Sequence, residues 1–196
     1  KLMSNLTIKG NGGAHYKTDF LSWFDGVDAM LKPTPDAPMP NVLVHVARIT
    51  NTPAGMTPGG MLLINPDNKE MPDLFGFICE DEELGKYYGP KIFKGTPFEN
   101  APVLVAKISM NIDFPNSVST KIEVADHVIE LELSNFDEAQ FYHREGGMPF
   151  TQNVVEALAH TAVFKFDGRV LEGQLPESGI GGGLPAVYSP AGIYHI

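Results

Sequence analysis

The sequence predicts a mainly β fold: an antiparallel β-barrel, or a sandwich closing to a barrel, with a few peripheral helices. Short runs of β-branched and aromatic residues recur between clusters of Gly, Pro, Asn and Asp, as is typical of strands and turns. Strands do not alternate with long helices, so a parallel α/β sheet is not expected. The 20 glycines and 16 prolines are scattered among apolar runs, which indicates a loop-rich β domain and not a disordered chain.

The N-terminal part contains the clearest helical periodicity. Apolar side chains recur at helical spacing over residues 17–31, and Pro33 and Pro35 end the pattern, so a helix is expected there. Strands are expected over 41–50, where His45 and Arg48 interrupt an apolar run, and over 61–64. The apolar run 74–79 is typical of a buried strand, and residues 80–87 of one or two helical turns.

The C-terminal half shows more regular alternation. One long strand is expected over 103–114, and a hairpin is expected between 119–125 and 127–133, with one polar face on each strand. A short helix is expected over 152–160. Asp167-Gly168 predicts a second hairpin, between 162–166 and 169–172. The Gly-rich segment after Pro176 is expected to form a tight turn or a flexible tail.

These elements fit one domain over residues 3–196, with Met3 as the initiator and Lys1 and Leu2 as remnants of cloning. The net charge of −10 and the lack of a Lys/Arg cluster disfavour binding to nucleic acid or to an anionic membrane surface. No stretch approaches the roughly 20 apolar residues of a membrane span, and no signal peptide is visible, so we expect a cytoplasmic protein. The sequence does not determine the oligomeric state, and a homo-oligomer is one of the alternatives.

The sequence lacks the motifs of several common kinds of functional site. The single Cys79 excludes an intramolecular disulfide and a cysteine zinc site, and its apolar neighbours indicate a core residue. The six histidines form no close pair at ligand spacing, so no metal is expected. The glycine run 179–183 lacks the Lys-Ser/Thr pair of a phosphate loop, and no G-x-S-x-G hydrolase motif occurs.

The candidate chemistry is concentrated in the segment 74–99. There, Lys91 follows Tyr87-Tyr88-Gly89-Pro90, which the sequence predicts to be a turn, and precedes Ile92-Phe93. A lysine among apolar groups can lose its charge, and a neutral amine can attack a carbonyl carbon to form a Schiff base. The alternative is that Lys91 and Lys94 are solvated cations whose stems cover neighbouring aromatic rings.

The order of these features resembles the acetoacetate decarboxylase superfamily. A helix leads through the proline-rich segment 33–40 to a strand, and an apolar strand leads through an acidic turn to Tyr88-Gly89-Pro90-Lys91. In that family the lysine after the proline forms the Schiff base with a β-keto acid, and the resemblance assigns this role to Lys91. The chain departs from the family at Ile92, where the family has a second lysine, and over 61–64, where no glutamate is found.

Two functions are therefore in competition. The first is a cofactor-independent, acetoacetate decarboxylase-like lyase that acts on a small keto acid or carbonyl compound, with Lys91 as nucleophile and Tyr88 and Glu99 as orienting or proton-transferring groups. The candidate ligand-binding residues are Phe75, Phe77, Phe93, Lys94 and Met110, and Phe75, Phe77 and Met110 are those that would line the cavity of a non-catalytic binder. The second is a non-catalytic, calycin-like barrel that binds a small apolar ligand inside. An interaction module would instead need a large exposed apolar patch.

Overall fold

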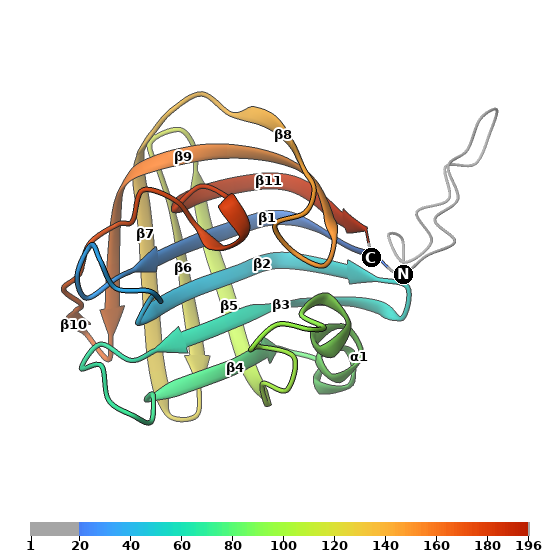
Figure 1. Cartoon of the computed structure of the whole chain (residues 1–196), viewed down its shortest axis with the longest axis horizontal. Coiled ribbons are helices and arrows are strands. Elements are labelled where there is room, and N and C mark those ends of the chain that lie inside the picture. The colour runs from blue at the N-terminus through green and yellow to red at the C-terminus, as the bar shows by residue number, and fades with distance from the viewer. Residues whose placement is uncertain (1–19, 196) are drawn as a thin grey trace.

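A computed structural model describes residues 20–195, and it confirms the mainly β fold that the sequence predicts. The described chain is 59% strand and 8% helix. Its strands form one sheet in the order β10-β9-β11-β1-β2-β3-β4-β5-β6-β7, and the pairing of β7 with β9 closes the sheet into a ring (Figure 1). The predicted loop over residues 4–13 lies outside the described residues.

The elements have the following bounds: β1 (Phe20–Leu31), β2 (Val42–Thr52), β3 (Gly55–Ile64), β4 (Leu74–Cys79), α1 (Glu82–Ile92), β5 (Val103–Asp113), β6 (Ser117–Val124), β7 (His127–Phe136), β8 (Gln140–Arg144), β9 (Thr151–Phe166), β10 (Arg169–Val170), a short 3-10 helix (Ile180–Gly182) and β11 (Ala186–His195). The named pairs are antiparallel except for β4 with β5, which are parallel and joined through α1.

The hydrophobic core lies inside the ring, between β1–β4 on one side and β5–β7 with the end of β9 on the other. Val44 and Leu62 meet it from the first side, and Ile122 and Leu131 from the second, all of them essentially inaccessible to solvent. Side chains therefore fill these interior positions as in a packed core.

The helix expected over residues 17–31 is wrong from Phe20 onward, where the chain forms strand β1; residues 17–19 lie outside the described part. β1 is buried on both faces, so its apolar residues form a nearly continuous run without the alternation of a half-exposed strand. Asp25 has a positive φ of 54°, and the strand exchanges its two faces around this residue. Trp23 packs in the cluster beneath α1, whereas Val27, four residues later, packs in the core, so the spacing of the apolar residues imitates a helix.

The short helix expected over 152–160 is also wrong, because this segment is the first part of β9. The long strand β9 runs through to Phe166 and includes the strand expected over 162–166. Its first half pairs with β8 on one side and β11 on the other. Val154 and Ala157 are both buried although they are not on the same face of a regular strand, which again removes the alternating pattern.

The remaining expectations are mostly confirmed. The strands over 41–50, 74–79 and 103–114, the β6–β7 hairpin and the Asp167-Gly168 hairpin are all present. β3 begins earlier than expected, at Gly55, and the Gly-rich segment holds the 3-10 helix. β8 and β11 have no counterpart among the predicted elements.

Helix α1 continues through the residues that were expected to form a turn. Asp81 caps its start by accepting hydrogen bonds from the backbone N–H groups of Glu83 and Leu84. Leu84, Tyr88 and Ile92 form a buried stripe at i, i+4 and i+8, and this burial favours the helix despite Pro90 near its end. Within residues 20–195 no helix has the length and apolar character required to cross a membrane.

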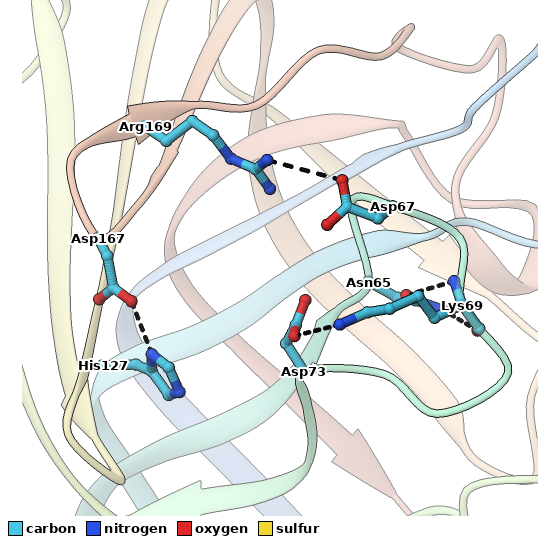
Figure 2. A network of polar contacts seen from close by, with 7 residues as sticks. All are labelled: Asn65, Asp67, Lys69, Asp73, His127, Asp167 and Arg169. Carbon is cyan, nitrogen blue, oxygen red and sulfur yellow. Dashed lines mark hydrogen bonds and ion pairs between the residues drawn. The ribbon is translucent and has the colours of Figure 1, made fainter.

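A polar network ties the β3–β4 loop to the β9–β10 hairpin (Figure 2). Asn65 exchanges two side chain–backbone hydrogen bonds with Lys69, whose Nζ lies 2.7 Å from Asp73 Oδ1. Arg169 lies 3.6 Å from Asp67 and connects this loop to the hairpin. At the hairpin turn, Asp167 accepts hydrogen bonds from the backbone N–H of Val128 (2.8 Å) and from His127 Nδ1 (2.7 Å).

Asp167 is expected to contribute to stability at neutral pH and to lose this contribution in acid. The Val128 N–H and then the His127 ring hold the pKa of Asp167 below its ordinary value. A carboxyl whose pKa is lower in the folded state stabilises the protein above the unfolded pKa, and the contribution disappears as the pH falls through the folded value. Asp167→Asn should therefore lower the urea midpoint at pH 7, and the difference from wild type should shrink below about pH 3.9.

A matched control is Asp126→Asn in the β6–β7 turn, where Asp126 also has a positive φ, of 63°. Asn tolerates this conformation as well as Asp does, so the two substitutions differ in the bonds they remove and not in backbone strain. Equal urea midpoints for the two variants at pH 7 would contradict a stabilising role for the Asp167 contacts.

Candidate functional site

Two adjoining cavities, each of about 50 Å³, lie on the face of the sheet that points away from the core, beneath α1 and the segments around β8 and the 3-10 helix. The first is lined mainly from β1, β2, β3, β11 and α1, and the second also from the segment 144–152 and the 3-10 helix. Five residues line both cavities: Asp28, His45, Phe93, Glu156 and Tyr194. The two spaces thus form one candidate site.

Asp28 and His45 are paired across neighbouring strands. They are direct partners in the β1–β2 register, which places Asp28 Oδ2 3.3 Å from His45 Nδ1. Burial acts to lower the pKa of His45, but the charge of Asp28, its hydrogen bond and the charge of Glu156 together raise the pKa above the ordinary 6.5. A carboxylate on Nδ1 fixes the orientation of the ring and leaves Nε2 as the nitrogen that can serve a ligand.

A second ion pair closes the far end of the site. Arg144 on β8 donates two hydrogen bonds to Glu156 on β9, at 3.1 and 2.8 Å, and a longer one of 3.4 Å to Gln152. The arginine also stacks on the Tyr142 ring, at 4.6 Å from the centroid. Both partners are largely buried, and the hydrogen bond to Glu156 raises the pKa of Arg144. Both side-chain oxygens of Glu156 therefore already accept hydrogen bonds from the arginine.

Aromatic side chains form one wall of the site. The Trp23 indole donates from Nε1 to Ser189 Oγ (3.0 Å) and lies directly on Gly192, where a Cβ would approach the ring to 2.3 Å. Tyr194 meets Trp23 edge-on at 4.7 Å and stacks on Phe150 at 4.1 Å. Burial, followed by the charges of Asp28 and Glu156, raises the pKa of Tyr194, so its phenol is neutral at physiological pH and can donate a hydrogen bond.

Of the catalytic residues that the sequence suggests, only Tyr88 lines the candidate site. Its buried hydroxyl donates weakly to the backbone oxygen of Ile78, at 3.4 Å. Lys91 is half-buried, with Nζ 4.2 Å from the centroid of the Tyr87 ring, and it is not among the residues that line either described cavity. Glu99 is half-exposed and accepts a hydrogen bond from the backbone N–H of Gly95 at 2.7 Å.

The predicted ligand-binding residues are dispersed. Phe93 lines both cavities, and Phe77 packs against it at 5.5 Å, without access to solvent. Phe75 packs at the edge of the same aromatic cluster, Lys94 is exposed, and Met110 lies on β5 in the other half of the ring. The structure thus brings Tyr88 and Phe93 together with residues that the sequence did not single out as a site: Asp28, His45, Arg144, Glu156 and Tyr194.

Only a weak signal in the sequence pointed to this set. His45 interrupts an apolar strand, which is unusual, but nothing local indicates Asp28 as its partner. Cys79 is a buried core residue as expected, and burial raises the pKa of its thiol to about 11, which leaves it protonated and unreactive at neutral pH. Among residues 20–195, no three His, Cys, Asp or Glu side chains converge as a metal site would require.

No known family model and no curated protein sequence matches this chain. The resemblance to the acetoacetate decarboxylase superfamily therefore stays a prediction from feature order and the Gly-Pro-Lys motif. A fold alone does not define a function, so the geometry of the site is the basis for assigning one.

Proposed function

We propose that the protein binds a small organic molecule in the two adjoining cavities beneath α1. The observation that carries this proposal is the shared lining, in which a His–Asp pair, a buried ion pair and a neutral phenol face the same apolar hollow. A concave, mainly apolar surface with a few convergent polar groups is the usual form of a small-molecule site. The aromatic wall would hold the body of the ligand and the polar groups would fix its orientation.

The location differs from that of a calycin-like barrel, where the ligand lies inside the ring. Here, residues such as Val44, Leu62, Ile122 and Leu131 occupy the interior of the ring. The cavities lie on the opposite face of β1 and β2, and their size favours a compact molecule over a long acyl chain. The ligand we propose is accordingly small and carries at least one polar group.

Ala47→Leu tests the proposal because Ala47 lines the first cavity and is buried. NMR titration of the labelled protein with 2-butanone, pyruvate and benzylamine should perturb amide signals around Asp28, His45 and Tyr194 for at least one probe. The added methyl groups should fill the cavity and weaken that binding about tenfold or more.

The control is Val163→Leu, an exposed position on β9 away from the site, which should leave the affinity unchanged. Thermal unfolding of both variants verifies that they remain folded. The proposal fails if no probe shifts these signals, or if Ala47→Leu and Val163→Leu bind the probe equally well.

A second candidate function is Schiff-base chemistry at Lys91. The observation in its favour is that Tyr88 and Ile92, neighbours of Lys91 on α1, line the first cavity while Lys91 is half-buried beside them. In this reaction the neutral amine adds to the keto group of a β-keto acid with loss of water. The resulting iminium accepts the electron pair of the breaking C–CO₂ bond, carbon dioxide leaves, and protonation and hydrolysis return the free lysine.

Borohydride reduction in the presence of acetoacetate tests this second function. A Schiff base at Lys91 should be trapped as a stable secondary amine on the peptide that contains it, as read by mass spectrometry. The adduct should disappear in Lys91→Arg and persist in Lys94→Arg, the exposed neighbour. Equal labelling of Lys91 and Lys94 would indicate a non-specific reaction and would contradict a Schiff-base role.

A further inference from the structure

We propose that His45, oriented by Asp28, is the catalytic base of the candidate site and removes a proton from the carbon next to the carbonyl group of a small ketone or keto acid. This inference rests on the proposed binding of a small molecule in the cavities, and it adds a reaction and a substrate class to that function.

The geometry provides the base. Asp28 Oδ2 lies 3.3 Å from His45 Nδ1, and His45 lines both cavities. A ring held in this way by a carboxylate presents Nε2 with a lone pair when it is neutral, and the carboxylate stabilises the imidazolium that forms when the ring takes a proton. In the same site, Glu156 has both carboxylate oxygens bonded to Arg144, so His45 is the better placed of the two to accept a proton.

The hydrogen-bond donor comes from the opposite side of β1. Tyr194 on β11 lines both cavities together with His45, and its phenol stays protonated. A base and a neutral phenol in one largely apolar site are the pair that proton removal next to a carbonyl requires, because negative charge develops on the carbonyl oxygen as the C–H bond breaks. This pair selects carbonyl compounds over amines or alcohols, which develop no such oxyanion.

The step balances without a further reactant. His45 Nε2 forms a bond to the departing proton, the C–H electron pair becomes the C=C bond of the enolate, and the C=O π pair moves to the oxygen, which accepts a hydrogen bond from Tyr194. The imidazolium then returns a proton to the carbon, and exchange of that proton with solvent replaces hydrogen by deuterium in heavy water.

The pH dependence follows from the ionisable groups that line the cavities together with His45. These are Asp28 on β1, Glu156 on β9, Arg144 on β8 and the two phenols Tyr194 and Tyr88. The two carboxylates favour the protonated ring, so the pKa of His45 lies above the ordinary 6.5. The base acts in its neutral form, and the exchange rate should rise as the pH increases through that raised pKa and then level off.

Exchange of the methyl protons of pyruvate and of the α-protons of 2-butanone, followed by ¹H NMR in D₂O, tests the inference. Wild type should accelerate exchange over buffer, and His45→Gln should reduce the enzymatic rate about 100-fold or more. His160→Gln is the matched control, since His160 forms an exposed pair with Asp137 at 2.9 Å, outside the cavities, and should leave the rate unchanged.

A separate measurement for each residue distinguishes the roles proposed for Asp28 and Tyr194 from a purely structural role. Asp28→Asn should shift the midpoint of the rate–pH profile to lower pH, because the positioning residue that favours the imidazolium has lost its charge. Tyr194→Phe should lower kcat more than it raises KM, because the phenol bonds the oxygen most strongly when that oxygen is charged. Amide spectra and thermal unfolding of each variant verify its fold.

The outcomes distinguish the inference from the function on which it rests. If a carbonyl probe binds at the site and its protons do not exchange, or exchange equally in wild type and His45→Gln, the inference is wrong and the binding function stands. If exchange is lost in Lys91→Arg but not in His45→Gln, the proton is removed through an iminium at Lys91, which also overturns it. If no probe binds, the proposed binding function is wrong, and the inference that rests on it is wrong as well.

Discussion

Phe77→Ala is expected to lower the free energy of unfolding by about 3–5 kcal/mol, as for other fully buried phenylalanines. Phe77 on β4 has no solvent exposure and packs against Phe93 at 5.5 Å. It also supports α1 directly, since a Cβ added at Gly89 would lie only 2.6 Å from its ring. Removing the ring therefore leaves a void beneath the helix that covers the candidate site.

Urea unfolding followed by tryptophan fluorescence measures this loss, because Trp23 lies in the neighbouring cluster beneath α1. The control is Phe141→Ala on β8, where the side chain is 66% exposed, and the expected loss is about 0.5 kcal/mol or less. An effect of Phe77→Ala as small as that of Phe141→Ala would mean that α1 is not anchored by this ring. An unchanged slope of free energy against urea would verify that the two variants unfold from comparably compact states.

Arg144→Met is expected to cost about 2–4 kcal/mol, somewhat less than the loss for a fully buried pair because the arginine retains some contact with solvent. The side chains of Arg144 and Glu156 are 17% and 11% exposed, and two hydrogen bonds of 3.1 and 2.8 Å join them. The substitution leaves the Glu156 carboxylate largely buried without its partner, so the loss comes mainly from an uncompensated charge.

The double variant Arg144→Met/Glu156→Met separates this cause from lost packing. Replacing both charges by apolar groups of similar length removes the unpaired carboxylate, so most of the stability should return. Lys86→Met serves as the surface control: Lys86 pairs with Glu82 and Glu83 on the exposed side of α1, and its urea midpoint should not change measurably. A double variant no more stable than Arg144→Met alone would contradict the unpaired-charge explanation.

The elements that the sequence predicts correctly are those with local causes. The turns at Asp126 and Asp167-Gly168 are determined by a few adjacent residues, and β6 and β7 alternate because one face of each is exposed. β1 and the first half of β9 imitate helices because each of these segments is covered on both faces. Burial on a second face depends on distant parts of the chain, so short-range periodicity cannot report it.

The same limit applies to the site. Tyr88 and Phe93 could be singled out because they lie in one short aromatic segment near Lys91. Asp28, His45 and Glu156 come from β1, β2 and β9, and only the register of a curved sheet brings them to one cavity. No spacing in the sequence records that register, so sequence patterns favour the residues nearest to the Gly-Pro-Lys motif and miss these three.

The closure of the ring also has a consequence for how the chain folds. β1 and its partner β11 are separated in the chain by all the strands from β2 to β10, and β9 must pair with both β11 and β7. Such pairings between distant segments are slow to form, because the entropy of a long loop is lost before the stabilising contacts are made. Until β11 pairs with it, β1 has an unpaired edge with apolar side chains that other chains can contact. We therefore expect aggregation to compete with folding most strongly when the protein is refolded at high concentration. A peptide with the sequence of β11 should suppress this aggregation.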